Sequence, residues 1–175
     1  MRKLATLLAL TALFTGSAHA QYVSVDYLDG DDGVDGYRFA YSPWETTFSD
    51  LPIVGDVDMA LEFSAAVWNY DEGSADESAF VLAATPVFTK TIGVIGKHPV
   101  YLEAAIGISV MDTIHFADKD LSSHYQFEDR FGIGMKFGQR LNHRVALRYF
   151  HYSNAGFDQP NPGMDFFNLS YNYSF

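Results

Sequence analysis

The residue types best suited to chemistry in this chain are a histidine and a serine, His151 and Ser153, separated by one residue. A serine hydroxyl becomes a nucleophile when a neighbouring imidazole accepts its proton, and such a pair can begin the hydrolysis of an ester. Both residues continue an alternating apolar series that starts with Val145, Leu147 and Tyr149. Alternate residues of a strand lie on one face, about 6.6 Å apart along the backbone. The spacing therefore allows the imidazole and the hydroxyl to meet.

The next alternating segment offers an acid for the same face. Counting back by twos from Phe167 puts Asp165 on the side of the apolar residues. A hairpin that pairs Asp165 with His151 also pairs Tyr149 with Phe167, and it matches apolar residues along the rest of the two segments. Directly opposite residues lie about 5 Å apart, so the carboxylate would accept the imidazole N–H and stabilise the imidazolium during catalysis.

Two other interpretations stay open on the spacing alone. A tight turn near Gln139 and Arg140 would bring Asp129 beside His151, and Asp129 would then orient the imidazole in place of Asp165. Alternatively, these polar residues mark the level at which strands leave the hydrocarbon of a membrane, where polar side chains are ordinary. In that case they need not react at all.

These side chains need strands to position them, and the C-terminal segment is the clearest strand. It alternates with a period of two between the apolar residues Phe167, Leu169, Tyr171, Tyr173 and Phe175 and the polar residues Asn168, Ser170, Asn172 and Ser174. Outer-membrane barrels commonly end in such a strand, with a terminal phenylalanine. Aromatic residues make up 16% of the chain, which suits the interfacial girdles of such a barrel.

Further segments of strand length are bounded by clusters of Gly, Pro, Asp or Asn. The predicted strands are 21–28, 34–44, 57–70, 77–90, 99–112, 122–138, 142–154 and 164–175. We therefore predict an all-β fold, an eight-stranded antiparallel transmembrane β-barrel of the outer membrane. An even number of strands puts both ends on the periplasmic side, and the loops near 29–33, 71–76, 113–121 and 155–163 outside.

The same alternation predicts a charged interior. The charged residues opposite the apolar faces are Arg38, Glu62, Glu103, Glu128, Arg130, Lys136, Arg144 and Arg148. Side chains can just fill an eight-stranded barrel, so we expect a packed ionic network and no pore. The outer loops are rich in acidic residues. The run from Asp29 to Gly33 lacks the full spacing and closing Glu of an EF-hand, which favours an acidic rim over a calcium site.

The remaining features concern export and partners. Residues 1–20 read as a signal peptide that ends at the cleavage site Ala18-His19-Ala20, which leaves 21–175 as one barrel domain. No later stretch approaches the roughly 18 apolar residues of a spanning helix. The chain has no cysteine, so no disulfide framework closes it. Its formal net charge of −11 would repel phosphate backbones, which argues against nucleic acid as a partner.

Three stretches of the sequence together resemble a known family. They are His151-Tyr152-Ser153-Asn154-Ala155-Gly156, followed by Gln159-Pro160-Asn161 and Gly163; Phe127-Glu128-Asp129-Arg130, followed by Gly132 and Gly134; and Glu103-Ala104-Ala105-Ile106-Gly107. In these motifs the chain resembles the PagL-type lipid A 3-O-deacylases, which are eight-stranded outer-membrane esterases. The resemblance covers at least the C-terminal half of the chain.

The resemblance implies a reaction and residue roles. Ser153 would attack the ester at the 3 position of lipid A, His151 would act as the general base, and the 3-hydroxyacyl chain would leave. Asn154 and the backbone N–H of Gly156 would form the oxyanion hole with support from Asn161, although asparagines also serve as turn residues. The family usually has Glu where this chain has the shorter Asp165.

The partners implied by the resemblance are lipid A of lipopolysaccharide and the outer membrane itself. No metal or organic cofactor is expected, and a homodimer is left open. Two functions of other classes remain: a noncatalytic structural or adhesive barrel that keeps the motif by descent, and a soluble periplasmic barrel that carries a ligand inside. The second would need an apolar interior and a polar exterior.

Overall fold

The computed structural model of the chain describes residues 22–31, 33–72 and 75–175. The predicted signal peptide, residues 1–20, and Gln21 at the start of the predicted first strand lie outside the described residues. Within the described part, no helix is long and apolar enough to cross a bilayer.

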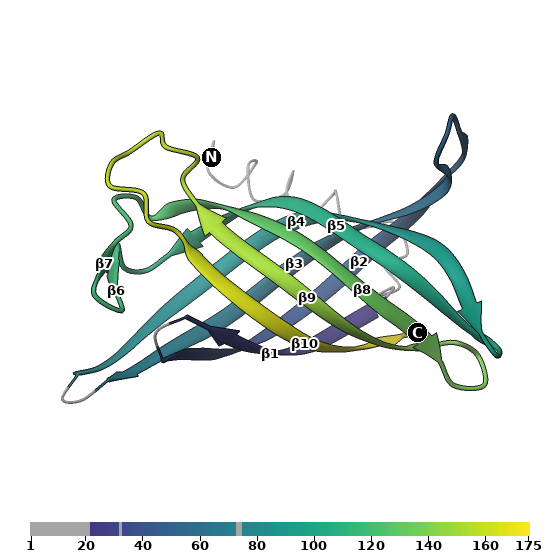
Figure 1. Ribbon diagram of the computed structural model, residues 1–175, viewed down its shortest axis with the longest axis horizontal. Helices are drawn as coiled ribbons and strands as arrows, with labels where there is room; N and C mark the ends of the chain where they lie inside the picture. The colour runs from purple at the N-terminus through teal and green to yellow at the C-terminus, as the bar shows by residue number, and fades with distance from the viewer. Residues whose placement is uncertain (1–21, 32, 73–74) are drawn as a thin grey trace, which may run out of the picture.

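Eight strands close into an antiparallel barrel, which confirms the predicted fold (Figure 1). The barrel strands are β1 (Tyr22–Gly30), β2 (Val34–Leu51), β3 (Gly55–Glu72), β4 (Ala75–Ile95), β5 (His98–Met111), β8 (Tyr125–Phe137), β9 (His143–Ser153) and β10 (Met164–Ser174). Each strand pairs with its sequence neighbours in the barrel, and β1 closes the ring against β10. The short hairpin of β6 (His115–Phe116) and β7 (Lys119–Asp120) lies within the loop between β5 and β8.

Three strands run further than the sequence predicted. β2 continues from the predicted end at Trp44 to Leu51, and β3 and β4 are longer with it. The predicted end lies just after Pro43, a residue that has no N–H to donate to a strand ladder. In the structure, β2 has a β-bulge at Ser42 and Pro43, between the paired residues Tyr41 and Trp44. The proline need not donate a ladder hydrogen bond there, and pairing with β3 resumes at Trp44.

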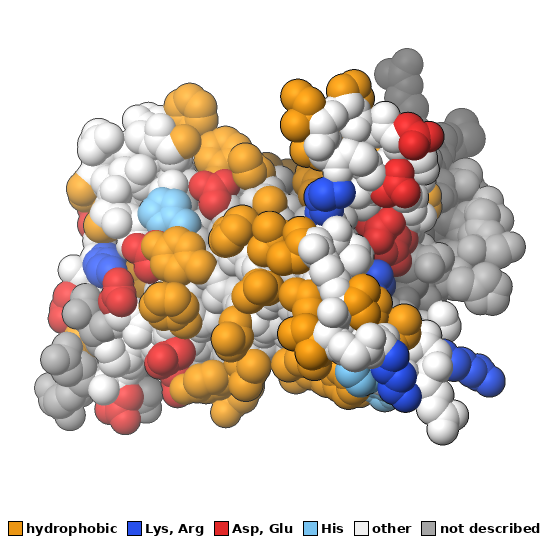
Figure 2. Space-filling view, turned by 45° about the vertical axis from the view of Figure 1, so that its right-hand side comes forward, with side chains coloured by type: hydrophobic (Ala, Val, Ile, Leu, Met, Phe, Trp, Pro, Cys, Tyr) orange, Lys and Arg blue, Asp and Glu red, His pale blue; other side chains and the backbone are white. Residues whose placement is uncertain are grey.

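The exterior of the barrel is apolar, as the alternation predicted. Along β9 the exposed fraction is 64% for Leu147 and 42% for Tyr149, but 4% for Arg148 and 0% for Phe150. Figure 2 shows apolar side chains gathered over the middle of the wall, with charged side chains toward its two ends. A soluble barrel with a polar exterior is therefore wrong for this chain.

The interior holds the predicted ionic network. Arg38, Arg130 and Arg148 are buried together with the carboxylates of Asp26, Glu62, Glu103 and Glu128. Arg130 alone lies 2.7 Å from Glu62, 2.9 Å from Glu128 and 3.2 Å from Glu103. Asp26 lies 2.7 Å from Arg38. The sequence analysis did not predict it as a member of the network, because a single acidic residue in a short strand does not indicate which cations it will contact.

Two predicted members of the network lie apart from it. Lys136 and Arg144 point inward but sit near the end of the barrel that carries the short turns. Each makes its own longer ion pair, Lys136 with Asp58 at 4.0 Å and Arg144 with Glu45 at 3.5 Å.

An aromatic cluster fills the barrel toward the long loops. Trp68 packs against Tyr152 and Phe166, with ring centroids 4.8 Å and 4.7 Å away. Phe116 of the β6–β7 hairpin reaches the same cluster, 6.1 Å from Trp68. The loop that carries this hairpin is therefore anchored to the barrel interior, beside the outer ends of β9 and β10.

The network predicts a large difference between two interior cations. Arg130→Met leaves three buried carboxylates without this partner, so we expect a loss of about 3–5 kcal/mol in the free energy of unfolding. Lys136→Met is the matched control, because its ion pair is single, long and half-buried. Urea titration of each variant in lipid vesicles, followed by heat-modifiable gel migration, measures both losses. Equal losses would contradict a central role for the network.

Candidate active site

The predicted site residues meet at the outer end of β9, on the lipid-facing wall. His151 pairs with Asp165 of β10 on one side and with Asp129 of β8 on the other. Both registers agree with the sequence prediction, as does the pairing of Tyr149 with Phe167. Because residues two apart share a face, Ser153 at the end of β9 points to the same side as His151.

His151 is bonded to one of its two candidate acids. Its Nδ1 lies 2.7 Å from Asp165 Oδ1, and the two side chains are 37% and 32% exposed. The carboxylate accepts a hydrogen bond from Nδ1–H, which leaves Nε2 as the acceptor nitrogen of the neutral ring. The Asp129 carboxylate makes no hydrogen bond to the His151 ring in the described part of the chain, although the two residues are paired in register. The geometry therefore favours Asp165 as the partner of the imidazole.

Gly163 supports the other edge of the imidazole. A Cβ atom at this position would lie 2.9 Å from His151 Cε1 and 3.0 Å from the carbonyl oxygen of Tyr152. The residue also has a φ of +70°, which glycine adopts without strain. The sequence motif contained this glycine without a role for it. In the structure it leaves just enough room for the histidine ring.

Ser153 lies on the same face as His151 but does not contact it through a hydrogen bond. Its hydroxyl makes no hydrogen bond to His151 or to any other residue that the structure describes. The side chain has one rotatable bond, and His151 lies on the same face one pleat away. The structure thus brings the histidine and the acid into contact and places Ser153 on the same face, without a hydrogen bond between its hydroxyl and the imidazole.

The loop after Ser153 is held by the predicted asparagines. Asn161 Oδ1 accepts the backbone N–H of Asn154 over 3.1 Å, and Asn154 Oδ1 accepts the backbone N–H of Gly156 over 2.8 Å. The Asn154 amide group also donates to the carbonyl oxygens of Asp158 and Leu121. These bonds are the turn chemistry expected of asparagine, so both candidate oxyanion donors are occupied in this structure.

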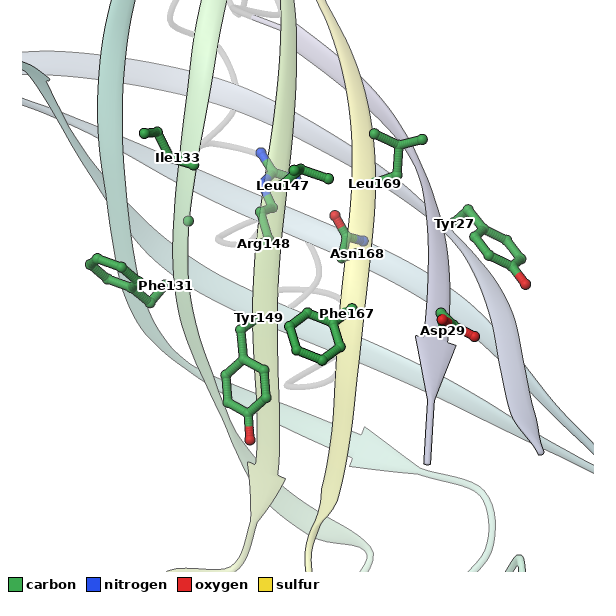
Figure 3. A pocket seen from close by; sticks show the side chains of 11 residues that line it. Tyr27, Asp29, Phe131, Ile133, Leu147, Arg148, Tyr149, Phe167, Asn168 and Leu169 are labelled. Carbon is green, nitrogen blue, oxygen red and sulfur yellow. The ribbon is translucent and has the colours of Figure 1, made fainter. Parts of the chain in front are cut away.

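Two apolar grooves descend the wall from the site, one on each side of a ridge formed by Phe131 and Tyr149. The groove over β8 to β1, shown in Figure 3, has a volume of about 470 Å³. The groove over β4 to β9 has a volume of about 510 Å³ and reaches His151. It exists because Ala104 stands between two phenylalanines, Phe88 and Phe131, on the neighbouring strands. A small side chain between two large ones leaves a channel on the apolar wall.

No group of three or more His, Asp or Glu residues in the described ranges is arranged to hold a metal ion. What the site offers is an imidazole oriented by a carboxylate, a serine hydroxyl on the same face and an apolar groove next to both. This set can cleave an ester whose acyl chain lies in the groove.

Comparison with known proteins gives one consistent result. The model of the family described as Lipid A 3-O-deacylase (PagL) matches residues 35–174. Lipid A deacylase PagL of Bordetella bronchiseptica is 37% identical over 121 residues, which are 69% of this chain and 65% of that protein. Lipid A deacylase PagL of Pseudomonas aeruginosa is 33% identical over 172 residues, which are 96% and 94% of the two chains.

The solved structures include a similar barrel. A crystal structure of the outer membrane enzyme PagL matches with a TM-score of 0.73 and 28% sequence identity, and the match covers 88% of this chain and 99% of that one. The likeness extends over nearly the whole described barrel, beyond the motifs around His151.

The contact at Gly163 predicts a sharp effect on ester hydrolysis. Gly163→Ala pushes the imidazole out of place, so we expect the rate of the purified, folded barrel to fall about a hundredfold. Gly96→Ala is the matched control, because Gly96 has a similar φ of +64° but nothing within 4 Å of the added methyl group. It should stay within about twofold of the wild type, since both variants carry the same backbone strain. Equal rates for the two variants would show that this packing does not matter.

Proposed function

The chain belongs to the lipid A 3-O-deacylase (PagL) family, and on that premise we propose that Ser153, His151 and Asp165 carry out its reaction. The protein is an ester hydrolase of the Gram-negative outer membrane that removes the acyl chain at the 3 position of lipid A. The observation that carries the assignment of residues is the hydrogen bond of 2.7 Å between His151 and Asp165, on the lipid-facing wall beside an apolar groove.

The first half of the reaction transfers the acyl group to the enzyme. Ser153 Oγ attacks the ester carbon while His151 Nε2 accepts the hydroxyl proton. Asp165 accepts a hydrogen bond from His151 Nδ1–H and stabilises the imidazolium that forms. When the tetrahedral intermediate collapses, the bond to the sugar oxygen breaks and His151 returns the proton to that oxygen. The products are an acyl group on Ser153 and a free 3-hydroxyl on lipid A.

The second half of the reaction frees the serine, with water as the nucleophile and Ser153 Oγ as the leaving group. His151 accepts a proton from water, the hydroxide attacks the acyl carbon, and the bond to Ser153 Oγ breaks as the proton passes to that oxygen. The released 3-hydroxy fatty acid carries the oxygen supplied by water. The half-exposed position of His151 suits this step, because water can reach it from the membrane interface.

The developing negative charge needs donors near Ser153. We assign this role to Asn154 and to the backbone N–H of Gly156, as the sequence motif implies. Because the Gly156 N–H donates to Asn154 Oδ1 in the free protein, the oxyanion must replace that side-chain oxygen as its acceptor. Asn161 supports the site by fixing the backbone N–H of Asn154, and Asp129 remains the alternative acid.

The position of the site on the wall suits a substrate that does not leave the bilayer. Drawing an acyl chain into water would cost about 0.8 kcal/mol for each CH₂ group. A site that faces sideways avoids this cost, because lipid A reaches it by lateral diffusion and its chains stay in hydrocarbon. The groove beside Ala104 is the path that we propose for the leaving chain.

The proposal includes processing and partners. Residues 1–20 are removed on export, and residues 21–175 form the barrel domain. The chain has 22 Asp and Glu residues against 11 Lys and Arg residues, so it would repel phosphate backbones, and nucleic acid is not among the proposed partners. A homodimer is compatible with the reaction only if its interface leaves the outer ends of β8, β9 and β10 open to lipid.

The main test separates the enzyme from a noncatalytic barrel that keeps the motif. Expression in a Gram-negative host without such an enzyme should remove one 3-hydroxyacyl chain from its lipid A, as measured by mass spectrometry. Ser153→Ala should reduce the rate at least about a thousandfold, because the nucleophile is lost. Ser123→Ala is the matched control, because it removes a serine hydroxyl from the loop before β8, outside the proposed site. Unchanged lipid A with a folded wild-type barrel would favour the noncatalytic alternative.

The groove gives a second prediction. Ala104→Phe fills the channel between Phe88 and Phe131, so we expect KM for lipid A to rise about tenfold while the fold is kept. Ala65→Phe is the control, since Ala65 also lies between large lipid-facing neighbours, Phe39 and Leu82, on a distant strand. Steady-state hydrolysis in mixed micelles measures both. A rise in KM of the same size in the control would exclude a specific groove.

A further inference from the structure

The proposed mechanism leaves one hydrogen bond at the site without a function. The hydroxyl of Tyr149 donates to Asp165 Oδ1 over 2.6 Å. His151 Nδ1 lies 2.7 Å from the same oxygen. Hydrogen bonds from a hydroxyl to a carboxylate at this distance are about twice as strong as neutral ones. A tyrosine therefore holds the very oxygen on which the histidine depends.

The place of Tyr149 follows from the strand geometry. It lies two residues before His151 on β9, so both side chains emerge on the lipid-facing side. Its direct cross-strand partner is Phe167, and Asp165 is the diagonal neighbour, within reach of a long side chain. The Tyr149 and Phe167 rings pack edge to face with centroids 5.7 Å apart. Figure 3 shows the two rings side by side, with the Tyr149 hydroxyl directed toward the outer end of β9.

Asp165 has little else to hold it. Tyr149 and His151 are its two hydrogen-bond donors among the residues that the structure describes. The carboxylate is about a third exposed at the start of β10, so we expect water and lipid head groups to compete for it. An aspartate is also short. Few of its rotamers bring an oxygen across the strand gap to the imidazole, and rotation of χ1 or χ2 would break the contact.

We propose that Tyr149 is a positioning residue, whose hydroxyl keeps the short Asp165 carboxylate in place for His151. The inference rests on the proposed function, because it has consequences for the rate only if Asp165 orients His151 during hydrolysis. Tyr149 acts through Asp165 and needs no contact with the ester. Its ring separates the two grooves, and that role belongs to the ring and is independent of the hydroxyl.

The first test removes the hydroxyl alone. Tyr149→Phe keeps the ring, its contact with Phe167 and the walls of both grooves. We expect kcat for lipid A to fall about tenfold, with KM within about twofold of the wild type. Tyr171→Phe is the matched control, because the Tyr171 hydroxyl bonds a histidine, His143, over 2.7 Å at the other end of the same hairpin. Its kcat should not change.

The second test asks whether the effect of Tyr149→Phe on kcat depends on the short side chain of Asp165. The longer side chain of an Asp165→Glu variant reaches His151 from more rotamers and needs the tyrosine less. In that background we expect Tyr149→Phe to change kcat by less than about twofold, so that the two substitutions are not additive. Heat-modifiable gel migration should show every variant folded to the same extent.

The outcomes separate this inference from the function on which it rests. A kcat for Tyr149→Phe that equals or exceeds that of the wild type overturns the inference, and so does an equal loss in both backgrounds. If Ser153→Ala or Asp165→Asn retains full activity, the assignment of the catalytic residues is wrong instead. Loss of activity in those two variants together with a fully active Tyr149→Phe leaves the proposed function standing and removes only the tyrosine.

Discussion

The buried ion pairs fix the direction in which six of the eight barrel strands face. Arg130 reaches carboxylates on three strands, and Arg38 and Arg148 extend the network to β1, β2 and β9. Because side chains alternate with a period of two, a slip of one residue would turn these charges into lipid and bring the apolar residues inside. Such a slip would leave several charges unpaired in hydrocarbon, which is far more costly than any local gain. The outward position of His151 follows from the inward position of Arg148.

Much of this arrangement could be predicted from the sequence, because the alternation is a property of the chain itself. The eight strands, the outward face of β9 and the pairing of His151 with Asp165 all depend on counting by twos. The long extensions of β2, β3 and β4 were not predictable in this way, since the bulge that absorbs Pro43 is stabilised by pairing with a neighbour. The β6–β7 hairpin has no periodic signal either, because each of its strands is only two residues long.

The fine structure of the site also lay beyond the sequence. The motif supplied the residue types, but the role of Gly163 depends on a contact with an imidazole that arrives from another strand. The hydrogen bond between Tyr149 and Asp165 is likewise diagonal across a hairpin, and a tyrosine in an apolar stripe gives no hint of a polar partner. For Asn154 the sequence offered two roles, an oxyanion donor and a turn residue, and the hydrogen bonds in the structure are those of a turn residue. Features that depend on side-chain rotamers across strands are those that periodicity does not encode.

The filling of the barrel has a consequence for the cell that makes it. The aromatic cluster around Trp68 closes the lumen toward the loops, and the layer of paired arginines and carboxylates occupies its middle. The side chains that the structure describes therefore fill the lumen, in contrast to the wide channels of larger barrels. An organism can thus place many copies of this catalyst in its surface and remodel the lipid there, while the permeability barrier against toxic compounds such as antibiotics stays intact.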